Sequence, residues 1–100
     1  MDSGIGAVIE AVRAARTKIR EDALPMARES GREPVPAAEE ATLLRAIAEL
    51  LDTVGELVDS TAGRLTTGAT RTTYMVARRR LRDEANNLKG DAEVAAARVK

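Results

Sequence analysis

The chain has 100 residues, equal numbers of basic and acidic side chains, and neither histidine nor cysteine. A length of this order corresponds to one domain. The absence of cysteine excludes disulfides, thiolate metal sites and cysteine nucleophiles, and the absence of histidine removes the commonest general base and metal ligand. We therefore expect no metal and no cofactor, and we expect the protein not to be an enzyme.

The first predicted helix covers residues 4–24 and is followed by a proline-rich linker at residues 31–36. We expect Pro25 to end or kink this helix, with one short helical turn after it. Two prolines within the linker keep it extended, and Pro36 suits the first position of a new helix. The helix itself is predicted by apolar residues at helical spacing, namely Ile5, Val8, Ile9, Val12 and Ile19.

The second predicted helix, residues 36–65, carries the strongest pattern of the sequence. Residues 43–58 read LLRAIAELLDTVGELV, in which apolar residues recur in alternating steps of three and four. Three of every seven positions are apolar, which is typical of a helix with two neighbours. The face suits a self-association or partner interface, and it equally suits the core of an intramolecular bundle; the two interpretations are compatible. Its residues are Leu43, Leu44, Ile47, Leu50, Leu51, Val54, Leu57 and Val58.

A turn rich in threonine and glycine is predicted at residues 66–70, followed by a third helix at residues 71–99. Gly90 with Asp91 is a candidate break inside this helix. One long helix from Pro36 to the end of the chain is the alternative, and it requires an oligomer. The third helix has a narrow apolar face, whose residues recur every seventh position: Tyr74, Leu81, Leu88 and Ala95. Such a face allows another helix to approach closely but buries little area.

A cluster of arginines on the third helix has two interpretations. Residues 31–60 carry a net charge of −5 and residues 61–100 carry +5, so the two segments complement each other. The arginines either contact phosphates of nucleic acid or another anion, or they pair with the acidic second helix, and we favour the pairing. The cluster consists of Arg78, Arg79, Arg80 and Arg82.

Two weaker motifs are interpreted as structural. Gly63 and Gly68 have the spacing of a phosphate-binding loop, but Ala69 replaces the required lysine and a helix precedes the motif. Adjacent carboxylates such as Glu39 and Glu40 diverge by about 100° around a helix and do not converge on one atom. We predict an interhelical turn for the first motif and solvated surface for the second.

These patterns predict an all-α fold in one domain, residues 1–100. It is either a three-helix bundle or an elongated helical hairpin with an extra N-terminal helix. That first helix packs alongside the hairpin or extends toward a neighbouring subunit. The chain is 44% hydrophobic, but 19 residues are alanine and none is Phe or Trp, so a monomer has a thin core and we expect an oligomer.

The expected function is helical assembly. The protein would be a structural or adaptor component of a larger complex, such as a virion or a secretion apparatus. Its partners are expected to be further copies of itself or another helical protein, and nucleic-acid binding through the arginines is the alternative. Met1 and Asp2 precede no basic segment, so we expect no signal peptide, and a cytoplasmic or particle-bound location is favoured.

In size and expected hairpin form, the chain is similar to the small helical secreted proteins of actinobacterial type VII systems. It has no tryptophan for the Trp-x-Gly turn of those proteins. Four residues after Tyr74 stands Arg78, where their export signal has an acidic residue. No family is assigned on this similarity.

Overall fold

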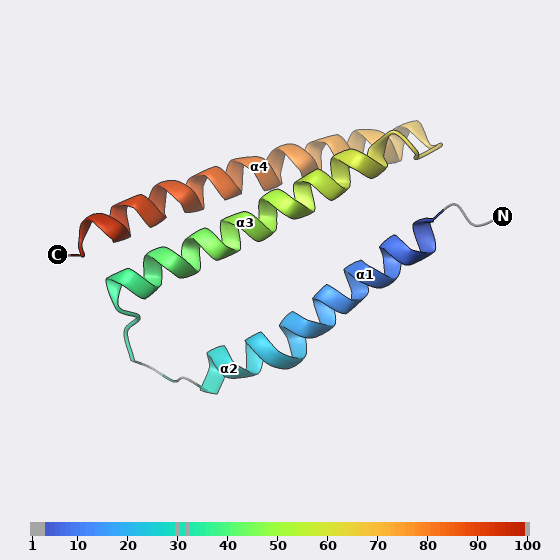
Figure 1. Cartoon of the computed structure of the whole chain (residues 1–100). Coiled ribbons are helices and arrows are strands. Elements are labelled where there is room, and N and C mark those ends of the chain that lie inside the picture. The colour runs from blue at the N-terminus through green and yellow to red at the C-terminus, as the bar shows by residue number, and fades with distance from the viewer. Residues whose placement is uncertain (1–3, 30, 32, 100) are drawn as a thin grey trace. The chain divides into compact units, whose positions relative to one another are not determined.

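The computed structural model describes residues 4–29, 31 and 33–99, and every regular element in this part of the chain is helical (Figure 1). The all-α prediction is therefore confirmed. The chain divides into two compact units, Met1–Pro34 and Val35–Lys100. Met1 and Asp2, on which the signal-peptide prediction rests, lie outside the described residues, as does Arg32 of the predicted linker.

The N-terminal unit is one run of helix that changes type at a proline. It consists of α1 (Ile5–Lys18), a π-helical turn (Ile19–Ala23) and α2 (Leu24–Glu29). The backbone N–H of Leu24 donates to the carbonyl of Ile19, five residues back. This wider turn relieves the clash that the ring of Pro25 would otherwise make with the carbonyl four residues before it. Pro25 thus changes the helix type, and the helix continues to Glu29.

The second unit begins with an extended segment that leads into α3 (Ala37–Ala62). Pro36 has the extended dihedrals φ −58° and ψ 148° and caps the helix, and its carbonyl accepts the N–H of Glu40 at 2.8 Å. Glu39 and Glu40 occupy the first turn, where the helix dipole favours negative charge.

The turn after α3 lies at residues 63–67, three residues earlier than predicted, and α4 spans Gly68–Ala97. Residues 68–70, which were predicted to lie in the turn, form the start of α4, and threonine hydroxyls bond to carbonyls of this first turn. Thr72 donates to the carbonyl of Gly68 and Thr73 to that of Ala69, both at 3.2 Å. The turn excludes one helix from Pro36 to the end of the chain. The predicted break at Gly90 is wrong, because α4 runs through it.

Helices α3 and α4 form an antiparallel hairpin whose contact surface is made of small residues. Three ion pairs fix its direction, since Glu40 near the start of α3 meets Arg98 at the end of α4. Asp52 binds Lys89, and Asp59 binds Arg78 nearer the turn. The fully buried side chains in the described residues are all alanine, Ala41 and Ala48 on α3 and Ala85, Ala92 and Ala95 on α4.

Gly55 extends this small-residue seam on α3. A methyl group added at Gly55 would lie 3.9 Å from the Cβ of Leu81, so the two helices approach closely at this level. Ala41, Ala48, Gly55 and Ala62 stand seven residues apart and therefore share one face of α3. The hairpin consequently closes on its smallest side chains and leaves the larger apolar ones at its edge.

Candidate helix–helix interface

The larger apolar side chains of α3 form a stripe that α4 does not cover. Leu43 is 52% exposed and Leu50 is 42% exposed, although both are leucines in the middle of a long helix. We call this set the α3 stripe; it consists of Leu43, Ile47, Leu50, Val54 and Leu57. Leu57 is half-buried and the other four are exposed. In steps of four and three, these residues follow the spacing of a helix–helix contact surface.

A second apolar row lies between the α3 stripe and α4. It is formed by Leu44, Leu51, Val58 and Leu65, all half-buried, which stand seven residues apart. Leu51 and the α4 residues Leu81 and Leu88 line a groove of about 590 Å³ between the two helices. Of the eight predicted interface residues, four are thus exposed and four are half-buried, and all belong to one continuous apolar sector of α3.

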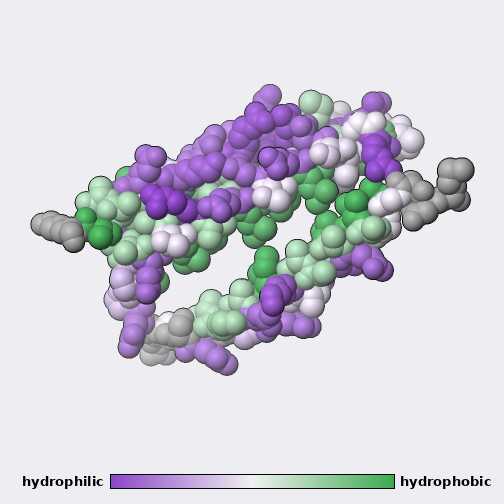
Figure 2. Space-filling view, in the orientation of Figure 1, coloured by the Kyte–Doolittle hydropathy of each residue, from purple (hydrophilic) through white to green (hydrophobic). Residues whose placement is uncertain are grey.

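Between residues 45 and 59, the charged residues of α3 gather on the side of the seam away from the α3 stripe. Figure 2 shows hydrophobic residues along the lower edge of the hairpin in that view and hydrophilic residues over its upper edge. The charged residues between positions 43 and 57 therefore lie in a row separate from the α3 stripe and do not interrupt it. The charged row follows the same alternating steps of four and three and consists of Arg45, Glu49, Asp52, Glu56 and Asp59.

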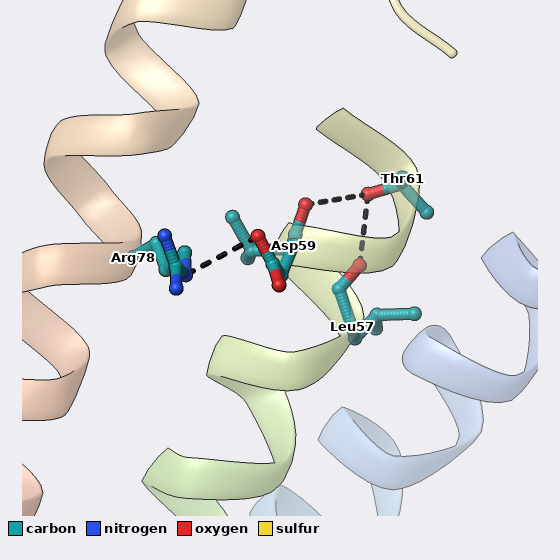
Figure 3. A network of polar contacts seen from close by, with 5 residues as sticks. Leu57, Asp59, Thr61 and Arg78 are labelled. Atoms are coloured by element: carbon teal, nitrogen blue, oxygen red, sulfur yellow. Dashed lines mark hydrogen bonds and ion pairs between the residues drawn. The ribbon is translucent and has the colours of Figure 1, made fainter. Parts of the chain in front are cut away.

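Threonine hydroxyls near the stripe are satisfied within α3, so they do not require water. Thr61 donates to the carbonyl of Leu57 at 2.9 Å, and the carbonyl of Val58 lies 3.2 Å from the same hydroxyl (Figure 3). Thr53 likewise bonds to the carbonyl of Glu49 at 2.9 Å. Since an unsatisfied hydroxyl is what makes threonine costly to bury, both positions tolerate contact with a further apolar surface.

The arginine cluster of α4 is divided between two environments. Arg78 binds Asp59 of α3, with Nε 3.2 Å from Oδ1 (Figure 3). Arg82 and Arg78 line a cavity of about 210 Å³ together with the carboxylates of Asp52, Glu56 and Asp59. Arg79 and Arg80 are exposed on the helix surface. Half of the cluster therefore faces the acidic side of α3.

The glycine motif fits its structural interpretation, whereas Glu40, predicted as solvated surface, is half-buried and binds Arg98. Gly63 belongs to the interhelical turn and Gly68 starts α4, with a helix before them where a phosphate-binding loop has a strand. Within the described ranges, no group of three acidic, histidine or cysteine side chains is arranged to hold a metal ion. No described helix is both long and apolar enough to cross a membrane.

The small-residue seam was missed by reasoning that followed only the large apolar residues. Its signal is present in the sequence, because four small residues recur every seventh position along α3. This spacing indicates a face on which another helix approaches closely. The α4 half of the contact was easier to predict. Ala95 belongs to the row that repeats in sevens through Tyr74, and the buried Ala85 and Ala92 stand seven residues apart beside it.

Comparison of the chain with protein-family models, with curated proteins and with solved structures gives no match. The functional interpretation therefore depends on the geometry of the α3 stripe and of the charged side of the hairpin.

Proposed function

We propose that this protein is a non-enzymatic assembly protein, a small structural component or adaptor of a larger complex, that works through helix–helix contact at the α3 stripe. The observation that carries the proposal is the exposure of this stripe. A row of Leu, Ile and Val side chains without cover is unfavourable in water, and a continuous exposed apolar surface typically marks a contact site.

The width of the apolar sector supports the same conclusion. Around the axis of α3, the half-buried leucine row lies between the small-residue seam and the α3 stripe. A helix that contacts a single neighbour needs only the first of these faces. An apolar sector with this extent is typical of a helix packed on two sides, and in this hairpin α4 occupies one side. The assembly proposed here adds a helix on the other.

The direct test is the solution mass of the full chain by light scattering, measured over a range of protein and salt concentrations. We expect masses above the 10.7 kDa of one chain, or association when a helical partner is added. Leu50→Asp places a charge in the middle of the α3 stripe and should disrupt assembly. Leu50 is 42% exposed, so the hairpin itself is expected to retain its helical circular dichroism.

Met75→Asp is the matched control. Met75 is an exposed apolar residue on α4, outside the α3 stripe, and the substitution introduces the same charge. It should leave the mass unchanged. A stable monomer whose behaviour is the same in the parent chain, in Leu50→Asp and in Met75→Asp would refute the proposed function.

Nucleic-acid binding is the weaker alternative. Arg78 is engaged by Asp59, and Asp83 and Glu84 follow the cluster directly, which reduces its local positive potential. Interleaved aromatic residues for base stacking are also missing apart from Tyr74. Affinity for DNA or RNA that falls steeply with salt, and that is lost in an Arg79→Glu, Arg80→Glu variant, would favour this alternative.

A further inference from the structure

We draw no further inference here: the strongest candidate, the exposed apolar surface patch that the α3 stripe forms along the hairpin, carries nothing beyond the proposed function, because nothing in the described part of the chain shows what covers it.

Discussion

Replacing Gly55 by alanine should stabilise the hairpin, although Gly55 lies in its contact surface. The position is helical and half-buried, and it has no left-handed dihedral that would require glycine. An added methyl group would meet the Cβ of Leu81 at 3.9 Å, an ordinary van der Waals distance. The seam therefore has room for one methyl group at this level.

The expected gain combines two effects. Alanine is favoured over glycine inside a helix by about 0.8–1 kcal/mol, because glycine loses more backbone entropy on folding. Partial burial of the methyl group adds a fraction of the ~0.8 kcal/mol that one buried CH₂ contributes. Gly55→Ala should thus raise the free energy of unfolding by about 1–1.5 kcal/mol.

Urea denaturation followed by circular dichroism at a fixed protein concentration measures this change. Gly90→Ala is the control, since Gly90 lies in α4 and an added methyl group meets nothing within 4 Å. The control should gain about 1 kcal/mol from helix propensity alone. If Gly55→Ala destabilises the protein while Gly90→Ala stabilises it, the helices approach more closely than described and the reasoning about the seam is wrong.

Three further predictions concern the same helices. Ala48→Leu, at a fully buried seam position, should cost about 1–3 kcal/mol in urea denaturation by forcing α3 and α4 apart, whereas Ala38→Leu on the exposed surface should be nearly neutral. A double-mutant cycle of Arg78→Gln and Asp59→Asn should give a coupling energy of about 1 kcal/mol or less, decreasing in 1 M salt, because Asp59 is 59% exposed and Arg78 is half-buried at the surface. A coupling energy well above this would contradict the assignment of a surface ion pair. Pro25→Ala should restore regular α-helical hydrogen bonding across residues 19–23, observable in NMR chemical shifts, and an unchanged π turn would show that Pro25 does not cause it.

The helices could be predicted because apolar periodicity reports directly on which face a helix buries. Their ends were less predictable because the residues there have competing preferences. Thr72 and Thr73 are poor helix formers by propensity, yet their hydroxyls bond to carbonyls of the first turn of α4. Gly90 does not break α4 because packing on both sides of it, at Ala85 and Ala92, outweighs a propensity cost of about 1 kcal/mol.

The candidate site was predictable as a sector of α3 but not in its detail. The sequence identifies Leu43 and Leu44 equally as apolar, and only the direction of α4 makes the first exposed and the second half-buried. That direction depends on the small residues, which a ranking by hydrophobicity overlooks. Ala48 contributes little area, but it lets a neighbouring backbone approach, and this determines which face of α3 meets α4.

The alanine seam and the exposed leucines have one common consequence. A hairpin closed on alanine buries little apolar area, while complete burial of a leucine or isoleucine is worth about 1.5–3 kcal/mol. With Leu43 and Leu50 about half exposed, covering the α3 stripe offers about 1 kcal/mol per exposed residue, or about 8 kcal/mol when its four exposed residues meet an equal partner surface. Association itself costs about 4–15 kcal/mol, so the two terms are comparable. The stripe should therefore give a reversible complex whose formation depends on concentration, and the free energy of unfolding should rise with the concentration of any partner that binds the folded chain.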